Sequence, residues 1–469
     1  MTDIIIVFCY LLITLVLGIW VGNKVGTKED YQTGGRNYPA WIVFTTLSAS
    51  YIGGGFTIGF AEKTYLYGIA FIVAVWGFSL KEILIGWFIA PRMQSFQNVL
   101  TVGDIMGRAY GKRAKIITGV ASVLVCGGII GAQLAACGSI LHTFLGPPPA
   151  IGALLAGGIV IIYATLGGLK SVVAVDVLHF VVFTLVIPLV LFFGIQEIGG
   201  LSPFIQSLPE SHLNALSTFD LKTLAVLFIS FFLGETLIPP YMQRLLIGRT
   251  FRETKRGTLW SGFYSIFFFL TIGCIGMVAL ILAPNISPAF ALPYLIQTVM
   301  PIGLKGMAIA ALFAVIMSSV DSFLNSISIT FSQDILIPLG LIGKSKNKDL
   351  LLYRSITLII GVVAIIISLS TSNSIDILLY SYQFWTPFIL TPLIAAIFGV
   401  QSSDKTFLIS AVTGVAGVII WNTIDPYHST SIEDGALVGT IFGVVLNGLT
   451  FIICHRYFRT SESKDHLLA

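Results

Sequence analysis

Charged residues are scarce in this chain of 469 residues. Asp, Glu, Lys and Arg make up only 10% of it, whereas hydrophobic residues make up 56% and the mean hydropathy is +0.93. Soluble globular domains carry about 25% charged residues, so the composition excludes that class. Apolar runs of roughly 20 residues, the length that crosses a bilayer as a helix, recur along the chain. The sequence therefore predicts an all-α integral membrane protein.

Patterns of metal, disulfide and nucleotide chemistry are also missing. The five cysteines lie in or beside apolar runs without metal-ligand spacing, which indicates small core residues. The six histidines are scattered and form no cluster with a nucleophile, which disfavours an enzyme. There is no Gly-x-x-x-x-Gly-Lys-Ser/Thr loop, which disfavours ATP-driven transport. Only a short tail follows Cys454, which disfavours a fused sensor. We expect no organic cofactor and no nucleic-acid partner.

The distribution of basic residues predicts an orientation. About thirteen spans are expected, and the first, Ile4–Val21, has no basic segment before it and indicates a retained helix rather than a signal peptide. With alternating spans, one side of the membrane holds all but four of the 26 Lys and Arg residues, the exceptions being Lys63, Lys81, Lys222 and Lys305. The positive-inside rule then predicts a multi-pass protein of the inner (plasma) membrane with the N-terminus outside and the C-terminus in the cytoplasm.

The ten spans after the first predict a five-plus-five inverted repeat. Its halves would begin with Trp41–Tyr67, which contains Gly53-Gly54-Gly55, and Leu224–Ile247, which contains Pro239-Pro240. Both spans carry helix breakers, as expected of broken helices that line a central site. The expected organisation is 1–40 as first span and cytoplasmic loop, 41–398 as ten-helix core (halves 41–195 and 224–398), and 399–469 as two extra spans and a short tail.

The segment Ala310–Ser322 places polar groups inside an apolar helix. Ser318, Ser319 and Asp321 stand where lipid would reject them, since an Asp at mid-membrane costs about 2.5–3.5 kcal/mol. Hydroxyl and carbonyl oxygens suit a small hard cation. The segment therefore predicts half of a sodium site, although hydroxyls that bond back to their own helix are the alternative.

Three motifs together resemble the sodium/solute symporter family. They are Asp30-Tyr-Gln-Thr-Gly-Gly-Arg36, the stretch Ala164–Asp176, and Ala314–Ser322 followed by Phe331-Ser-Gln-Asp334. The resemblance runs from the N-terminus to around residue 455 and implies a LeuT-type fold that couples sodium entry to solute uptake.

The resemblance also implies the ion ligands. Sodium, the only metal ion expected, would be held by the carbonyls of Ala49, Ile52 and Val315 and by the hydroxyls of Ser318 and Ser319. Asp176 would belong to a second ion site or ion route, with a loop or helix-cap carboxylate as the alternative. Asp321 and Ser322 could share a second cation or a proton. His179, three residues after Asp176, is a candidate source of pH dependence, with a packed neutral ring as the alternative.

Within the family, the chain is similar to the high-affinity choline transporter branch through Ile52-Gly-Gly-Gly-Phe56 and Tyr241-Met-Gln-Arg244. Tyr51 and Ile238 stand where that branch has Trp, so a cage for choline itself is weakened. The expected solute-binding residues are Tyr51, Gly53, Gly54, Gly55, Phe56 and Glu235. Glu235 would hold a positive nitrogen, with a structural pair to a base such as Lys81 as the alternative.

The sequence thus predicts a sodium-coupled secondary active symporter that imports a small organic solute by alternating access. The expected solute is a zwitterion or cation, such as an amino acid, a betaine or a choline-like molecule. A vitamin such as pantothenate, or a sugar, is the alternative solute, and a membrane-embedded sensor or enzyme and a passive channel are the alternative classes. We expect the protein to work as a monomer in the lipid bilayer.

Overall fold

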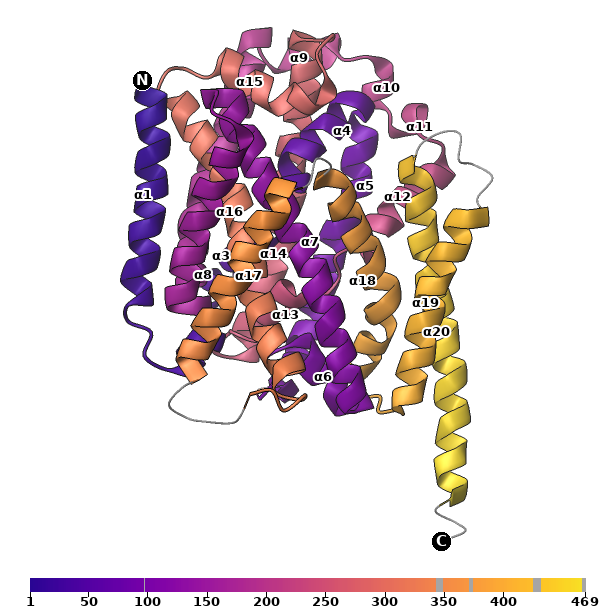
Figure 1. The fold of residues 1–469 in the computed structure, drawn as a ribbon. Coiled ribbons are helices and arrows are strands. Elements are labelled where there is room, and N and C mark those ends of the chain that lie inside the picture. The colour runs from indigo at the N-terminus through magenta and orange to yellow at the C-terminus, as the bar shows by residue number, and fades with distance from the viewer. Residues whose placement is uncertain (97, 343–348, 371–373, 425–431, 466–469) are drawn as a thin grey trace.

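The computed structural model is helical throughout and describes residues 1–96, 98–342, 349–370, 374–424 and 432–465 (Figure 1). Within that part of the chain there is no strand, and the only β-pairing is an isolated bridge between Tyr38 and Gly248. The predicted all-α class is therefore confirmed. Residues 425–431 and 466–469 of the predicted C-terminal unit 399–469 lie outside the described residues.

The long helices are α1 (Thr2–Gly22), α5 (Ile69–Leu84), α7 (Lys112–Leu145), α8 (Pro149–Ile198), α14 (Phe251–Leu282), α16 (Leu304–Thr330), α17 (Asp349–Ser370), α18 (Ser374–Ile397), α19 (Asp404–Ile424) and α20 (Ile432–Asp465). The short helices are α2 (Lys28–Thr33), α3 (Ala40–Tyr51), α4 (Phe60–Tyr67), α6 (Val102–Tyr110), α9 (Leu201–Ser207), α10 (Glu210–Leu213), α11 (Ala215–Thr218), α12 (Leu221–Leu233), α13 (Pro239–Leu245) and α15 (Ala291–Val299). π-Helical turns span Gly55–Gly59, Ile85–Ile89 and Phe331–Leu336, and 3-10 turns span Ala90–Phe96 and Pro288–Phe290.

The described residues include nine helices that are long and apolar enough to cross a membrane. A bent pair, Ala40–Tyr51 with Gly55–Tyr67, makes a tenth. The fifth and sixth predicted spans share the 50-residue helix α8, and the seventh falls on the short helix α12 together with α13. The count of thirteen therefore remains a prediction, because it depends on whether α8 crosses twice and whether α12 with α13 crosses at all.

Helix α8 is two helices joined at a sharp kink. Gly168 has φ +52° and ψ −140°, values that only glycine adopts readily. Tyr163 and Ser171 would be about 12 Å apart along a straight helix, yet both contact Gly18: a Cβ on Gly18 would lie 2.4 Å from Tyr163 Cβ, and Ser171 Oγ donates to the Gly18 carbonyl over 2.8 Å. The chain therefore turns at Gly168, and α1 lies against both arms of α8.

Two helices are broken, as the sequence predicts. Helix α3 ends at Tyr51, Ile52 is extended (φ −76°, ψ 93°), and the chain resumes after a bend of 73°. The second break follows α12, where Glu235 and Leu237 have φ of +51° and +55° before Pro239 begins α13. Such backbone costs about 1–3 kcal/mol at each non-glycine residue and persists only where the surroundings enforce it.

The polar helix α16 is the innermost element. In the most apolar stretch of its span Leu304–Leu336, 94% is buried inside the protein, whereas the corresponding share for α1 is 28%. Its N-terminal end is held by α1, because Asp3 Oδ1 accepts hydrogen bonds from the amides of Gly303 (2.7 Å) and Gly306 (2.9 Å). The serines and the Asp of α16 therefore face protein and not lipid.

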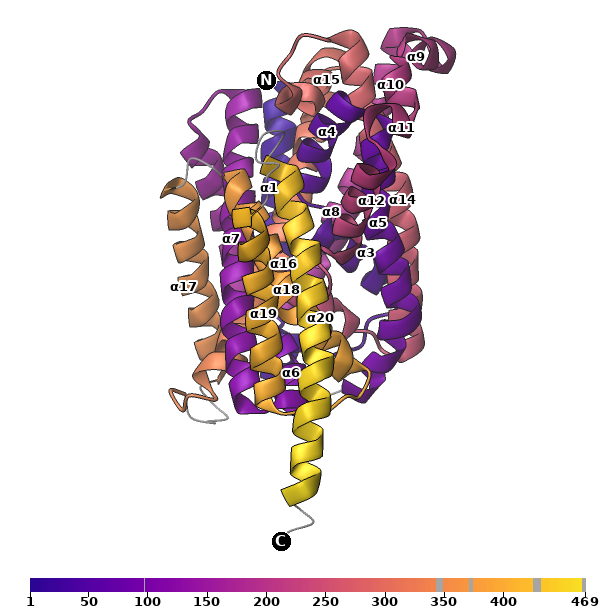
Figure 2. The ribbon, with the colours of Figure 1, turned by 90° about the vertical axis from the view of Figure 1, so that its right-hand side faces the viewer.

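The helices pack as two sets. In one set, α8 and α16 contact each other and both contact α1 and α7; in the other, α14 contacts α3, α4 and α5, and α5 contacts α12. The view in Figure 2 separates α7 and α17 on one side from α5, α12 and α14 on the other. The break in α3 lies against α16, so a boundary between the two sets runs through the polar centre.

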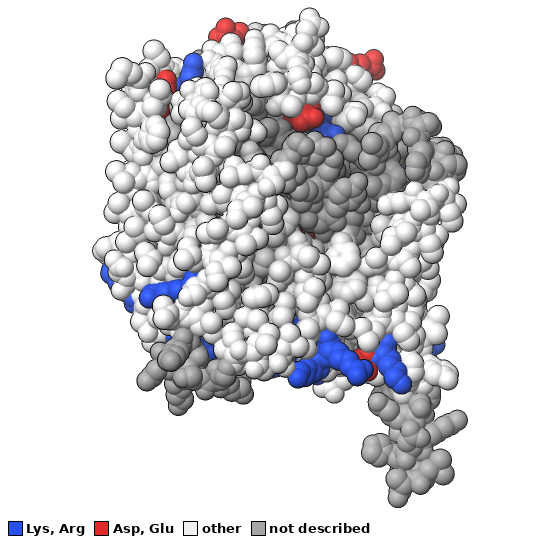
Figure 3. All heavy atoms as spheres, in the orientation of Figure 1, with Lys and Arg blue, Asp and Glu red and all other residues white. Residues whose placement is uncertain are grey.

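Basic side chains gather toward one end of the molecule. On the face drawn in Figure 3, most blue side chains lie at the end that also carries the C-terminus, while red ones lie mainly at the opposite end. The positive-inside rule would place this end in the cytoplasm, and the orientation stays a prediction.

The close contact at Gly18 provides a test of the α1 packing. The side chain of Gly18→Val would overlap with Tyr163. We therefore expect the free energy of unfolding to fall by about 1–3 kcal/mol, with a lower Tm in detergent. Gly158→Ala is the matched control, because a Cβ there meets nothing within 4 Å and alanine favours helix by about 0.5–1 kcal/mol. A Tm for Gly18→Val equal to that of the control would contradict this packing.

Candidate functional site

The five residues expected to bind sodium meet at the break of α3. Ser318 Oγ donates to the carbonyls of Ala49 (2.9 Å) and Val315 (3.0 Å). Ser319 Oγ lies 3.3 Å from the Ser50 carbonyl and 3.5 Å from those of Ile52 and Val315. All are buried. The carbonyls at the end of α3 have no intrahelical partner, so oxygens from two helices converge in a site closed to solvent.

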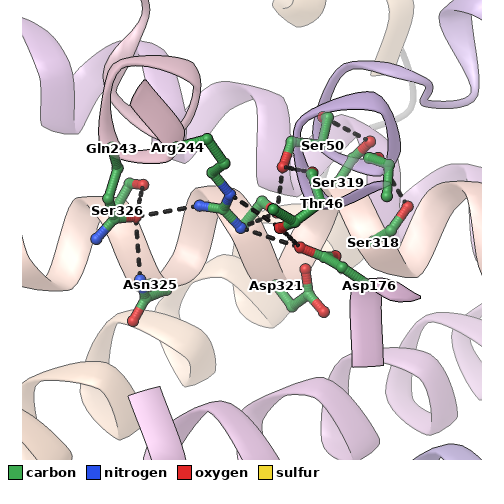
Figure 4. Close-up of polar contacts among 12 residues, drawn as sticks. Thr46, Ser50, Asp176, Gln243, Arg244, Ser318, Ser319, Asp321, Asn325 and Ser326 are labelled. Carbon is green, nitrogen blue, oxygen red and sulfur yellow. Dashed lines mark hydrogen bonds and ion pairs between the residues drawn. The ribbon is translucent and has the colours of Figure 1, made fainter. Parts of the chain in front are cut away.

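A buried charge cluster lies directly beside these oxygens (Figure 4). Asp176 Oδ2 accepts from Thr46 Oγ1 and from Arg244 Nη2 at 3.2 Å. Arg244 Nη2 also donates to Ser322 Oγ over 2.6 Å, and Ser322 Oγ is 2.9 Å from Ser50 Oγ. Asp176 and Arg244 have no exposed surface. The alternative of a loop or helix-cap carboxylate at Asp176 is therefore wrong.

A second carboxylate lies in the same cluster. Asp321, also fully buried, accepts from Tyr163 Oη over 2.5 Å. Asp176 Oδ1 and Asp321 Oδ1 have no hydrogen-bond partner among the described residues. With two carboxylates and one guanidinium, the cluster carries a formal charge of about −1, and an uncompensated buried charge is costly.

Arg244 is one of the basic residues that the charge distribution assigns to the cytoplasmic side of the membrane, but its side chain is buried in the protein. The residue lies in α13, and its guanidinium turns inward to Asp176. Its neighbour Gln243 accepts through Oε1 from Asn325 Nδ2 (3.1 Å) and Ser326 Oγ (2.8 Å). These contacts join α13 to α16 on the C-terminal side of the serine pair.

His179 is held by the N-terminal helix. Its Nδ1 is bonded to the Tyr10 hydroxyl of α1, and its Nε2 has no partner within the described residues. The ring is fully buried. This arrangement matches the packed alternative.

The predicted solute-binding residues at the glycine break differ in how far they are buried. Gly53 and Gly54 are buried, whereas Gly55 is exposed and Phe56 is half-buried. The Gly54 amide donates to Gln133 Oε1 of α7 over 3.1 Å, and a Cβ on Gly53 would lie 2.8 Å from both Gln133 Nε2 and Ser319 Oγ. Glycine is needed here because the backbone lies directly against polar side chains.

Tyr51 and Phe56 belong to an aromatic wall. Both rings pack on Phe78, each with a centroid distance of 4.9 Å. The Tyr51 hydroxyl donates to the Ser261 carbonyl over 2.8 Å, which fixes the ring. Tyr241 closes the wall at 6.2 Å from Tyr51.

Glu235 joins this wall at the second break. Its Oε2 accepts from Tyr241 Oη over 2.5 Å, and only 7% of the residue is exposed. Lys81 forms its ion pair with Glu82 at 3.3 Å. A structural pair of Glu235 with a base such as Lys81 stays the alternative to a solute-binding role.

Arg244, Gln133 and Thr46 are polar residues at the site that sequence reasoning did not select. Arg244 was present in the quoted Tyr241–Arg244 motif, and the preceding Pro239-Pro240 pair could have indicated a helix that begins inside the membrane. Gln133 carries the one amide side chain of helix α7, and such a polar group in an apolar helix is a signal of a functional site.

Comparison with known proteins supplies the family. The model of the sodium:solute symporter family matches residues 31–414. The chain belongs to this family. It is therefore a multi-pass membrane transporter, and sodium-coupled symport is the activity of the family.

Individual relatives are distant. The chain is 24% identical to the sodium/sialic acid symporter of Proteus mirabilis over 76% of this chain and 75% of that one. It is 26% identical to the sodium/glucose cotransporter of Vibrio parahaemolyticus over 71% of this chain and 68% of that one.

Solved structures confirm the fold. A sodium-coupled sialic acid symporter in a substrate-bound outward-open state matches with a TM-score of 0.85 at 19% identity, covering 97% of this chain and 98% of that one. A nucleobase-cation-symport-1 family transporter in a closed conformation matches with a TM-score of 0.57 at 11% identity, over 91% of this chain. The predicted LeuT-type architecture is thus correct.

Removal of Arg244 provides a test of the charge cluster. Arg244→Gln leaves two buried carboxylates without their cation. We therefore expect the free energy of unfolding to fall by about 3–5 kcal/mol, seen as a lower Tm. The double variant Arg244→Gln with Asp176→Asn should regain part of the lost stability, because it contains one buried carboxylate fewer. Arg249→Gln, on an exposed residue, is the control. Equal Tm values for the single and double variants would mean that Asp176 and Arg244 are not energetically coupled.

Proposed function

We propose that this symporter couples sodium entry to the uptake of a small organic cation or zwitterion. The observation that carries the sodium part is the convergence of Ser318 and Ser319 with the carbonyls at the end of α3. These oxygens come from two helices of different packing sets, and a bound cation would hold the two sets together.

Sodium fits this position chemically. Three carbonyl oxygens, from Ala49, Ile52 and Val315, and two hydroxyl oxygens offer a neutral, all-oxygen ligand set for a small hard cation. The hydroxyls donate to carbonyls in the structure, and a bound cation would replace these hydrogen bonds. The bend of α3 supplies its carbonyls without exposing them to lipid.

We further propose that Asp176, Asp321 and Ser322 form a second cation position or a station on the ion route. Two free carboxylate oxygens within the described structure and a formal charge of about −1 support this role. Arg244 compensates one carboxylate, and a cation would compensate the other.

The solute would bind between the two breaks. Tyr51, Gly53, Gly54, Gly55 and Phe56 come from the first break, and Glu235 comes from the second. Aromatic faces and a carboxylate are the groups that bind an organic ammonium, each aromatic face contributing about 0.5–2 kcal/mol. Gln133, which bonds the Gly54 amide, would offer its amide to a polar part of the solute.

Alternating access would then follow from the broken helices. A single sodium ion entering down a potential of about 100 mV gains about 2.3 kcal/mol, which adds to its chemical gradient. Sodium at Ser318 and Ser319 would stabilise the outward-facing state that accepts the solute. Exit toward the cytoplasm would require the contacts of Arg244 and Gln243 with α16 and Asp176 to separate.

The remaining assignments rest on charge and topology. We propose the inner (plasma) membrane, with the N-terminus outside and the basic end in the cytoplasm. The transport core would be residues 41–398, with 399–469 peripheral, in a monomer that works alone.

A sugar or an acidic solute is the second candidate. The names of the relatives favour it, since they describe sialic acid and glucose symporters. The carboxylates of Glu82 and Glu235 in the solute region argue against an acid such as a sialate or pantothenate.

The sodium site can be tested through its hydroxyls. Ser318→Ala and Ser319→Ala each remove one of five ligands, so we expect at least about a tenfold rise in the sodium concentration for half-maximal uptake. Ser328→Ala is the matched control, because this buried serine of α16 bonds back to Leu324 in its own helix. Unchanged sodium dependence in both ligand variants would place the ion elsewhere.

The solute pocket can be tested at Glu235. Glu235→Gln keeps the shape but removes the charge, so we expect a rise of about tenfold or more in the KM for solute, with the sodium response of a conformational probe retained. Glu210→Gln, at an exposed position of α10, is the control. An unchanged KM, or a transported solute that is an anion or a neutral sugar, would refute a cationic pocket and leave the sodium site intact.

A further inference from the structure

Two motifs of the sequence, Asp30–Arg36 and Tyr241–Arg244, meet below the charge cluster, where α13 and α6 lie toward the basic end of the molecule (Figure 1). Gln243 Nε2 donates to the Gln32 backbone carbonyl over 3.3 Å and so joins α13 to α2. Both side chains are buried. The two motifs and the neighbouring loops line a seam that has no room for a water molecule, and its residues include Gln32, Thr33, Arg36, Val99, Gln243 and Leu246.

Gln243 makes the contacts that hold this seam shut (Figure 4). Its Oε1 accepts from Asn325 Nδ2 (3.1 Å) and Ser326 Oγ (2.8 Å) of α16, and from Arg244 Nη1 (3.1 Å). With the bond to α2, this one amide takes part in four hydrogen bonds. A single side chain of α13 therefore fastens α13 to α16 through its oxygen and to α2 through its nitrogen.

The two sides of the seam belong to different packing sets. Helix α13 contacts α3, and the loop after it is paired with the start of α3, because the Arg249 amide donates to the Tyr38 carbonyl over 2.9 Å. Helix α2 lies on α8, where Tyr31 Oη donates to the Ala164 carbonyl over 3.2 Å. The bonds of Gln243 therefore cross the boundary between the set around α14 and the set around α8 and α16.

A tight turn links the two sets beside this boundary. Between α2 and Tyr38, the residues Gly34, Gly35 and Arg36 have φ of +62°, +81° and +48°. Such backbone at a non-glycine residue is strained and is common at switch regions. A few residues that absorb φ and ψ changes are what a hinge requires. The turn Gly34–Arg36 is therefore placed to let α3 and α13 rotate away from α2.

The closed seam leaves one donor unsatisfied. Gln32 Nε2 is buried and has no hydrogen-bond partner within the described residues. A buried donor without a partner is costly, and water that enters an open seam would satisfy it. This gain would offset part of the bonding that Gln243 gives up on opening. The closed and open states of the seam can therefore lie close in free energy, as a gate requires.

A continuous run of hydrogen bonds leads from the serine pair to Gln243. Ser319 Oγ donates to the Ser50 carbonyl over 3.3 Å, and Ser50 Oγ lies 2.9 Å from Ser322 Oγ. Arg244 Nη2 donates to Ser322 Oγ over 2.6 Å, while its Nη1 donates to Gln243. Ligands that fix the first of these groups would therefore also restrict the last.

We propose that Gln243 is the latch of the gate at the basic end: its four hydrogen bonds close the seam, and sodium at Ser318 and Ser319 strengthens them through Ser322 and Arg244. The inference rests on the proposed function and adds how the inner side stays shut while solute enters from outside. Gln243 is a positioning residue, because it acts through its neighbours and not on the ion or the solute.

The reactivity of a cysteine in the seam measures opening. Val99→Cys puts a thiol at a buried position of the seam, and Leu292→Cys does so in α15 at the opposite end (Figure 1). The purified full-length protein is treated with N-ethylmaleimide, in sodium or in potassium. Mass spectrometry follows each site separately, so the five native cysteines can stay. We expect slow modification of Val99→Cys, and sodium should slow it further.

Gln243→Leu keeps the approximate volume and removes all four bonds. We expect modification of Val99→Cys to become about tenfold faster or more, without acceleration at Leu292→Cys. Sodium should still raise the Tm of this variant but should no longer protect Val99→Cys, a result that a merely structural role would not give. Gln206→Leu, at an exposed position of α9, is the control. An unchanged rate at Val99→Cys, or an equal rise at both reporters, overturns the latch.

Ser326→Ala is a milder variant that decides the question if Gln243→Leu does not fold. It removes only the 2.8 Å bond and leaves Gln243 in place. We expect modification of Val99→Cys to become about two- to tenfold faster. Ser328→Ala is its matched control, because that hydroxyl bonds within its own helix. Equal rates in the two serine variants would refute the latch.

The response of the wild-type latch to sodium separates this proposal from the wider one. If sodium raises the Tm but leaves the rate at Val99→Cys unchanged, the sodium site stands and its link to the latch is refuted. If sodium changes neither, the sodium site is refuted, and the rates in Gln243→Leu still decide whether Gln243 holds the gate.

Discussion

The hydrogen bonding of backbone groups inside a bilayer is the constraint on which the rest of this structure depends. A helix that stops at mid-membrane leaves carbonyls that lipid cannot satisfy. Helix α3 stops at Tyr51, and the hydroxyls of Ser318 and Ser319 meet its carbonyls from α16. The break is therefore stable only because a polar helix lies against it, and that helix is tolerated only because other helices surround it on nearly all sides. The same oxygens form the proposed ion site.

Buried carboxylates are also stabilised by nearby polar or basic groups, and this occurs at two places. Near the proposed sodium ligands, Arg244 compensates Asp176 while Asp321 keeps one oxygen free within the described structure. Near the proposed solute position, Lys81 pairs with Glu82 and Glu235 bonds to Tyr241. Each cluster contains two acids and one base, so each carries a formal charge of about −1 that a transported cation would neutralise. One region faces α16 and the other the break after α12, which keeps the two proposed cations apart.

Much of the fold could be predicted from the sequence, because length, hydropathy and helix breakers are local signals. The glycine break, the proline break and the meeting of Ser318 with Ala49 were all predictable in this way, with the family resemblance supplying the partner. Contacts between polar residues far apart in the sequence could not be predicted. Nothing local indicates that Arg244 turns inward to Asp176, 68 positions away, rather than outward to water. Nothing local indicates that the Lys81 ammonium reaches the Gly234 carbonyl, 153 positions away. The number of crossings stays a prediction, although the predicted division of the fifth and sixth spans between Leu166 and Val172 contains the kink at Gly168.

The N-terminal helix has a consequence for motion. Helix α1 lies outside the predicted ten-helix core, yet it caps the N-terminal end of α16 through Asp3 and contacts both arms of α8 through Gly18. A helix bonded to two others at separate levels prevents them from sliding past each other. Helices α1, α8 and α16 are therefore expected to behave as one rigid frame. Displacement during transport then falls to the other set, and the bend of α3 marks where a moving part meets a stationary one.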